Sequence, residues 1–315
     1  MRVWRALDDV EVATGADPGR RSVVTIGNFD GLHRGHQQVL AGVVERGREL
    51  GATSVVTTFD PHPMTVIHPH AAPLRLTDMD RRLALLDELG VDAVLVLPFT
   101  RELSLWEPPQ FVERVLVDAL RAVEVHVGEN FRFGHRAAGN IGTLREEGAR
   151  HGFAVHDVPL AGDSARWSST YVRQCIAEGD TTAAAEALGR PHRVEGPVVE
   201  GDKRGRALGY PTANLALDDD VAVPADGVYA GWLVRASGDR MPAAISIGTN
   251  PTFGGTTRRV EAHVLDRDDL ELYGERVGVE FADRLRETVA FDGVAPLLEQ
   301  MARDVEQARA LTAAP

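Results

Sequence analysis

The sequence contains a single cysteine among its 315 residues. With Cys175 alone, neither an intramolecular disulfide nor a zinc site built from several cysteines can form, as is typical of proteins in a reducing cytoplasm. No apolar run reaches the roughly 18 residues that a membrane helix needs, and the N-terminus carries no signal-peptide pattern. These absences predict a cytoplasmic protein without a membrane partner.

Lysine is equally scarce, because Lys203 is the only one in the chain. A Walker A loop needs a lysine after its second glycine, so that phosphate-binding loop is excluded. An enzyme that stores AMP on a lysine is also excluded for the N-terminal half, which has none. Any nucleotidyl transfer there is therefore expected to be direct.

Basic residues are fewer than acidic ones, which gives the chain a formal net charge of −13 at pH 7. This balance argues against a nucleic-acid partner, since such binding depends on neutralising phosphates with lysine and arginine. Small anionic substrates would need locally placed donors or a metal ion. The length is sufficient for two domains with separate cores.

Short apolar runs rich in valine alternate with helical patterns over residues 1–188. We expect strands at Val23–Ile26, Ser54–Phe59, Ala93–Phe99, Val123–Val127 and Phe153–Val158. We expect helices at Gln37–Leu50, Asp78–Leu89, Phe111–Leu120 and Gly142–His151. The alternation predicts an α/β domain with a Rossmann-like parallel sheet and helices on both faces. In such folds ligands bind outside the carboxyl ends of the strands.

The pattern changes after an alanine-rich helical stretch, Thr181–Leu188, which is followed by Gly189 and Pro191. We place a domain boundary at residue 188. Residues 189–315 are expected to form a mainly β domain, a small closed barrel with a terminal helix at Ala295–Leu311. Its expected strands are Arg193–Glu200, Gly227–Ala236, Pro242–Ile247, Val260–Asp266 and Gly278–Phe281.

The stretch 27–36, G-N-F-D-G-L-H-R-G-H, joins the first expected strand to the first expected helix. A glycine-rich strand–turn–helix junction presents backbone N–H groups to an anion. His33 and His36 lie three apart at the helix start and can donate hydrogen bonds to phosphate oxygens. Two alternatives are a metal site with Asp30 as third ligand and a turn without a ligand. The strand–turn–helix context favours phosphate.

Three further blocks follow the expected strands: T-F-D-P-H-P at 58–63, G-E-N-F-R-F-G at 128–134 and S-S-T-Y-V-R at 168–173. Taken alone, the first is a turn constrained by proline and the second a loop bounded by glycines. The third is a helix N-cap.

In this order and spacing, the four blocks resemble the FAD synthetase module of the bacterial bifunctional riboflavin kinase/FAD synthetases, within the nucleotidyltransferase superfamily. The resemblance implies catalytic roles for His33 and His36 and flavin contacts for Asp60 and Phe131. Many relatives have aspartate where this chain has Asn130. The nucleotide and phosphate contacts that it implies are Gly27, Asn28, Phe29, Asp30, Gly35, Asn130, Ser168, Ser169, Thr170 and Arg173.

A second glycine-rich stretch, G-D-K-R-G-R-A-L-G-Y-P-T-A-N-L at 201–215, clusters basic side chains between glycines. Such a loop suits a triphosphate, although an exposed basic turn would look the same. Thr212 and Asn214 are two apart, so in an extended segment both side chains face one way. Their hydroxyl and amide oxygens are hard ligands suited to Mg²⁺.

The P-T-A-N string resembles the signature of riboflavin kinases. Four later blocks strengthen the resemblance, because they follow in the order found in that family. These blocks are P-A-D-G-V-Y-A at 224–230, S-I-G-T-N-P-T-F-G at 246–254, V-E-A-H-V-L-D at 260–266 and L-Y-G at 272–274. The resemblance implies Mg²⁺ ligands at Thr212 and Asn214 and a catalytic base at Glu261, which without it would be an ordinary solvent-facing strand glutamate. The implied phosphate contacts are Gly201, Lys203, Arg206, Gly209 and Pro211.

The sequence thus predicts a bifunctional transferase that uses ATP and Mg²⁺ to convert riboflavin into FMN and FMN into FAD. The phosphate of FMN is already anionic and needs no base, whereas the riboflavin hydroxyl must lose a proton. Two alternatives are a nucleotidyltransferase of another specificity and a flavin-binding regulatory protein with one inactive site.

Overall fold

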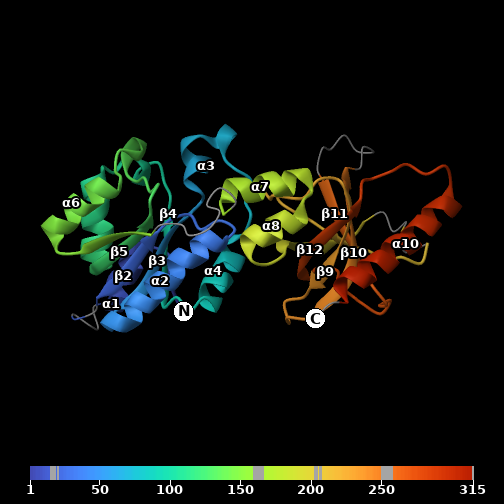
Figure 1. Ribbon diagram of the computed structural model, residues 1–315, viewed down its shortest axis with the longest axis horizontal. Helices are drawn as coiled ribbons and strands as arrows, with labels where there is room; N and C mark the ends of the chain where they lie inside the picture. The colour runs from blue at the N-terminus through green and yellow to red at the C-terminus, as the bar shows by residue number, and fades with distance from the viewer. Residues whose placement is uncertain are drawn as a thin grey trace. The chain divides into compact units, whose positions relative to one another are not determined.

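The computed structural model describes residues 1–14, 19, 21–158, 167–201, 205, 208–249 and 258–313. The chain packs into two compact units (Figure 1). The first unit comprises Met1–Pro73 and Met79–Ser164, and the second comprises Leu74–Asp78 and Ala165–Pro315. Among the described residues, no helix is long and apolar enough to cross a membrane.

The first unit is built on a six-stranded sheet in the order β1-β4-β3-β2-β5-β6, with every neighbouring pair parallel. The chain leaves β2 for β3 on one side and later returns to place β5 on the other. The strand order therefore reverses beside β2, the position where open α/β sheets bind ligands. The strands are β1 (Arg2–Trp4), β2 (Ser22–Ile26), β3 (Thr53–Asp60), β4 (Ala93–Pro98), β5 (Ala122–Gly128) and β6 (Ala154–Val158).

Both faces of the central strands β2 and β4 are buried, because successive strand residues enter different cores. On β4, Leu95 packs in one apolar cluster with Leu116, whereas Val94 and Val96 pack in the other with Leu40. The helical segments are α1 (Leu7–Thr14), α2 (Arg34–Leu50), α3 (Pro63–Ile67), α4 (Met79–Glu88), α5 (Pro108–Phe111), α6 (Ile141–His151), the π-helical η3 (Val112–Ala119) and the short 3-10 turns η1 (Pro69–Ala71), η2 (Leu103–Leu105) and η4 (His135–Ala137).

The second unit is a closed barrel in the order β10-β11-β8-β7-β12-β9, with antiparallel pairing throughout. Alternate residues along β11 point into its apolar core, so Val260, Ala262 and Val264 are buried. Its elements are α7 (Ser169–Glu178), α8 (Thr181–Leu188), β7 (His192–Val199), β8 (Ala213–Leu215), β9 (Gly227–Val234), β10 (Arg240–Thr249), β11 (Arg258–Val264), β12 (Arg276–Arg286) and α10 (Val294–Thr312).

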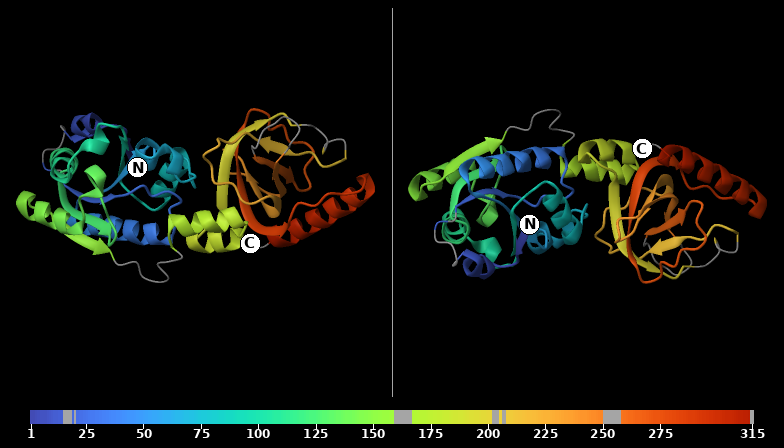
Figure 2. Two further views of the ribbon diagram at one scale, coloured as in Figure 1. Left: turned by 90° about the horizontal axis from the view of Figure 1, so that it is seen from above. Right: turned by 90° about the horizontal axis from the view of Figure 1, so that it is seen from below.

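The C-terminal helix α10 lies against the outside of the barrel (Figure 2). Asp304 on α10 is 4% exposed and accepts hydrogen bonds from Arg286 on β12, Nε to Oδ1 at 3.0 Å and Nη2 to Oδ2 at 2.7 Å. Gln300 Nε2 donates to the same carboxylate at 2.8 Å. An ion pair with a buried carboxylate and a half-buried guanidinium therefore links the helix to the last strand.

Both predicted fold classes are confirmed: a parallel sheet with helices on its two faces, and a closed barrel with a terminal helix. The single helix expected at Phe111–Leu120 was wrong in detail, because a short α-helix begins at Pro108 and passes into a π-helix at Val112. The three-residue strands β1 and β8 were not predicted. Helices α7 and α8 pack with the second unit, and the functional boundary at residue 188 stays a prediction.

Candidate functional site

A cavity of about 1010 Å³ opens in the first unit at the carboxyl ends of its strands. Segments that follow β2, β3, β4 and β5 contribute its walls, so the cavity lies where the strand order reverses. Four residues predicted from the sequence line it, two from the first glycine-rich turn and two from the loop after β5. Its walls include Gly27, Asn28, His62, Phe99, Asn130 and Phe131.

The turn between β2 and α2 has an unusual backbone. Phe29 and Leu32 adopt φ of 49° and 41°, the left-handed region that costs non-glycine residues conformational energy. Both side chains are buried, at 3% and 1% exposure, in one core cluster with Leu40 of α2. A Cβ on Gly27 would lie 3.2 Å from the Phe29 ring. Apolar packing thus holds the strained turn in place, a feature that the motif alone did not reveal.

His33 and His36 lie at the start of α2 with their rings stacked, 3.6 Å between centroids. His33 is the N-cap, and its Nδ1 accepts from the His36 backbone N–H at 3.4 Å. Burial lowers the pKa of His36 well below its usual range, and the nearby charges of His33 and Arg82 lower that pKa further. His36 Nδ1 is buried without a hydrogen-bond partner among the described residues. The neutral imidazole near the helix N-terminus therefore has one buried nitrogen that makes no hydrogen bond to the described residues.

Polar side chains contact Asn28 in the turn between β2 and α2. Asn28 Nδ2 lies 3.0 Å from His62 Nε2, and Thr58 Oγ1 donates to the Asn28 carbonyl at 3.1 Å. Asn28 Oδ1 is buried and has no hydrogen-bond partner in the described part of the chain. The sequence reasoning missed His62 as a wall of the cavity, although it belongs to the quoted F-D-P-H-P block.

Asp30 is 3% exposed and pairs with Arg82 of α4, Nη2 to Oδ1 at 3.5 Å. Among the described residues, Asp30 and the two histidines do not place three ligand atoms within reach of one ion. The geometry at this turn therefore gives no support to the alternative of a metal site.

The other predicted residues of the first unit occupy different places. Gly35 is buried in the first turn of α2. Asp60 is the exposed last residue of β3, and its carbonyl accepts from the Phe99 N–H at 3.0 Å. Phe131 stacks on Phe133 with 5.4 Å between ring centroids. Asn130 is exposed in the loop after β5.

The S-S-T-Y-V-R block opens α7 in the second unit. Ser168 is the N-cap, and its Oγ accepts from the Tyr171 N–H at 3.1 Å. Arg173 Nε donates to the Leu74 carbonyl at 2.5 Å. The capping role considered from the sequence is thus observed, while the phosphate contacts of Ser168, Ser169, Thr170 and Arg173 stay predictions.

In the barrel, β8 and β11 bring the second set of predicted residues together. Asn214 and Glu261 are directly opposite in the antiparallel register. Thr212 Oγ1 donates to Glu261 Oε2 at 3.4 Å, and Asn214 Nδ2 lies 3.5 Å from Thr212 Oγ1. These side chains are half-buried on the outward face, opposite the buried face of Val260 and Ala262. A carboxylate, a hydroxyl and an amide thus share one small area.

Asn214 Oδ1 is buried and has no hydrogen-bond partner among the residues that the structure describes. Gly201 lies against it, because a Cβ at position 201 would approach the Asn214 side chain to 2.5 Å. A cavity of about 80 Å³ is lined in part by Gly201, Pro211, Thr212 and Asn214. Gly209 has φ of 87°, the left-handed region that favours glycine.

His263, two residues beyond Glu261, contacts the same segment through Nδ1, which lies 2.8 Å from the Pro211 carbonyl. Lys203, Arg206 and the stretch 250–254 lie outside the described residues. The predicted phosphate contacts of Lys203 and Arg206 therefore stay predictions from the sequence.

Two family models match the chain, one over each half. The model described as FAD synthetase matches residues 16–171, and the one described as riboflavin kinase matches residues 188–312. The first range contains the turn with His33 and His36, and the second contains Thr212, Asn214 and Glu261.

Relatives match over nearly the whole length. A bifunctional riboflavin kinase/FMN adenylyltransferase of Escherichia coli (strain K12) is 37% identical over 98% of this chain and 97% of the relative. One of Pseudomonas fluorescens is 40% identical over 93% of this chain and 94% of the relative. A crystal structure named macrolide-efflux protein, from Streptococcus pneumoniae, has a TM-score of 0.83 and 32% identity over 92% of this chain and 94% of that one.

Proposed function

Because the chain belongs to the family of bifunctional riboflavin kinase/FMN adenylyltransferases, we propose that it makes FMN from riboflavin and ATP, and FAD from FMN and ATP. The observation that carries the kinase assignment is the contact of Glu261 with Thr212 across β8 and β11. The Glu261 carboxylate lies beside a hydroxyl and an amide oxygen that has no hydrogen-bond partner among the described residues. This arrangement provides a base next to a set of cation ligands.

At the kinase site the attacking group is the neutral 5′-hydroxyl of riboflavin. Glu261 accepts its proton as the oxygen attacks the γ-phosphorus, and the departing ADP carries the leaving charge. The residues fit a Mg²⁺ ion, because the buried Oδ1 of Asn214 is an oxygen ligand without a protein partner among the described residues. Thr212 and Asn214 would hold that ion. When bound, it neutralises charge on the ATP phosphates.

Gly201 and Gly209 shape the loop beside this ligand pair. The place of Gly201 against Asn214 leaves no room for a side chain. The backbone at these glycines, with Pro211 and the basic Lys203 and Arg206, contacts the ATP phosphates. This role rests on the sequence for Lys203 and Arg206.

The adenylyltransferase site needs no general base, since the attacking phosphate of FMN is already ionised. Its task is to position two anions and to stabilise charge on the α-phosphate of ATP. His33 and His36 donate hydrogen bonds there, aided by backbone N–H groups at the start of α2. The lowered pKa of His36 keeps its ring neutral before ATP binds.

The cavity of about 1010 Å³ holds the nucleotide and the flavin of this reaction. Gly27, Asn28 and Asn130 contact the nucleotide, and Phe131 offers the flavin an aromatic face. The sequence resemblance alone supports further phosphate contacts at Ser168, Ser169, Thr170 and Arg173, and Mg²⁺ accompanies the ATP. The enzyme works in the cytoplasm on small molecules.

The test is a time course with riboflavin, ATP and Mg²⁺ in which FMN and FAD are separated. The wild-type protein is expected to form FMN first and FAD later. The variant His36→Ala is expected to stop at FMN, because losing one such donor typically lowers the rate by about 10²–10³-fold. The exposed His70→Ala serves as the matched control. Absence of any FMN, or FAD formation by His36→Ala at the control rate, would refute the respective assignment.

A further inference from the structure

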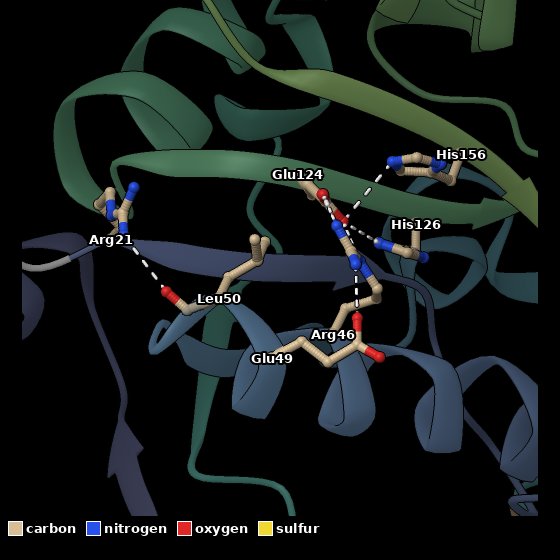
Figure 3. Close-up of polar contacts among 7 residues, drawn as sticks. All are labelled: Arg21, Arg46, Glu49, Leu50, Glu124, His126 and His156. Carbon is tan, nitrogen blue, oxygen red and sulfur yellow. Dashed lines mark hydrogen bonds and ion pairs between the residues drawn. The ribbon is translucent and has the colours of Figure 1, made fainter.

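A second polar cluster lies on the sheet of the first unit, among residues that neither motif contains. Glu124 and His126 are two apart on β5, so their side chains point to the same face. His156 on the edge strand β6 is opposite His126 in the parallel register. The three side chains converge above the strands, next to α2 (Figure 3).

The distances within this cluster are those of a ligand set. His126 Nε2 lies 3.0 Å from Glu124 Oε2, and His156 Nε2 lies 3.5 Å from the same oxygen. The two imidazole rings are stacked with 4.6 Å between centroids. One nitrogen or oxygen from each residue lies within 4.8 Å of the others, close enough for a single ion to touch all three.

The three residues of the cluster differ in solvent exposure. Glu124 and His126 are buried, at 8% and 6% exposure, whereas the His156 side chain is 47% exposed. An ion could therefore enter from solvent past His156. None of the three residues lines the cavity of about 1010 Å³, and none belongs to the sequence motifs of the two proposed sites.

Arg46 on α2 holds the carboxylate from the opposite direction. Its Nη2 donates to Glu124 Oε1 at 2.5 Å and its Nε to Oε2 at 3.0 Å, while Nη1 pairs with Glu49. This fork holds the Glu124 carboxylate beside the two imidazoles. Its positive charge also competes with any cation for the same oxygens.

We propose that Glu124, His126 and His156 bind a divalent transition-metal ion of the Zn²⁺ class, with water completing the coordination. Two imidazoles and one carboxylate are a ligand set that Zn²⁺ accepts, and the accessible side toward His156 leaves room for the water. Mg²⁺ is disfavoured, because it prefers oxygen ligands. The bound ion would link β5 to the edge strand β6.

The experiment is a calorimetric titration of the full-length, chelator-treated protein with Zn²⁺, in excess Mg²⁺ to occupy sites for hard cations. One equivalent of Zn²⁺ is expected to bind the wild-type protein. His156→Asn is expected to weaken binding by more than the roughly 10–100-fold that losing an outer-shell partner costs. Because His156 is half exposed, this variant is expected to fold. His151→Asn is the matched control, since His151 faces a single carboxylate, Glu147.

Arg46→Leu separates a metal site from a simple charge network. With the competing guanidinium removed, Zn²⁺ is expected to bind about tenfold tighter or more, because a nearby positive charge repels the ion. A network without a metal would show no Zn²⁺ binding in either protein. His36→Asn, which alters the other histidine pair, is expected to bind Zn²⁺ as the wild type does.

The visible absorption of Co²⁺ added in place of Zn²⁺ reports ligand geometry and is expected to be lost in His156→Asn. Thermal unfolding supplies a further readout, since an ion that binds only the folded state raises the melting temperature. The proposal is overturned if the wild type binds no Zn²⁺. It is also overturned if His156→Asn binds as the control does, or if His36→Asn alone abolishes binding.

Discussion

The substitution Glu261→Gln separates the two proposed reactions most cleanly. The amide replaces the carboxylate with the same shape, and its oxygen still accepts from Thr212 Oγ1, which now lies 3.4 Å from Glu261 Oε2. The side chain is half-buried on the outer face of β11 and takes no part in the barrel core. The fold is therefore expected to survive, and the loss is confined to the base.

The magnitude follows from the chemistry of the lost group. A positioned general base typically contributes about 10²–10⁴-fold to a rate, which is about 2.7–5.4 kcal/mol of transition-state stabilisation at about 1.36 kcal/mol per factor of ten. The loss is expected in kcat, with the KM for ATP nearly unchanged, since Glu261 acts on the hydroxyl and not on the nucleotide.

The assay follows FMN formation from riboflavin, and in parallel FAD formation from supplied FMN. Glu261→Gln is expected to lose the first reaction and keep the second, with the exposed Glu299→Gln of α10 as the matched control. FMN formation within a few-fold of the control would refute Glu261 as the base. Loss of both reactions would refute the independence of the two sites.

Three further outcomes are expected. Asn214→Ala removes the buried oxygen without a partner among the described residues, so the Mg²⁺ concentration for half-maximal FMN formation should rise in a Mg²⁺ titration. Burial lowers the pKa of His36 in the folded chain, so below about pH 6.5 the unfolded chain binds a proton that the folded chain does not. The free energy of unfolding is therefore expected to fall as the pH is lowered. Between about pH 7.5 and about pH 5.5, urea unfolding should show a smaller decrease in this free energy for His36→Asn than for the wild type. Asp304→Ala leaves Arg286, whose side chain is 21% exposed, without its carboxylate partner and should cost about 1–3 kcal/mol in urea unfolding. A cost below about 0.5 kcal/mol would contradict the role of that ion pair.

The architecture was readable from the sequence because periodicity and composition agree in both halves. Valine-rich runs such as Ala93–Pro98 are buried on both faces of a parallel sheet, which makes them nearly continuous in apolar residues. The alternation along β11 is equally explicit, since only Val260, Ala262 and Val264 face the core. The three-residue strands β1 and β8 carry no such period, and only pairing with neighbouring strands defines them.

The candidate sites could be predicted from the sequence where their residues are close together along the chain. The spacing of Thr212 and Asn214 predicts that they share a face, but the approach of Glu261 depends on the register of β8 against β11, nearly fifty residues apart along the chain. The left-handed backbone of Phe29 and Leu32 was likewise not predictable from residue types that normally avoid it. Tertiary packing, not local propensity, sets these features.

The cluster of Glu124, His126 and His156 shows the same limit in its strongest form. Residues 124 and 126 are read from the sequence as an ordinary strand, in which alternate polar residues favour a solvent-facing side. Here that side meets Arg46 from α2 and His156 from the next strand, because the parallel register places His156 opposite His126. A set of metal-ligating groups therefore arises from three segments that share no motif. It follows that a substitution shifting the β5–β6 register by one residue would separate the two imidazoles to opposite faces and abolish Zn²⁺ binding without removing any ligand.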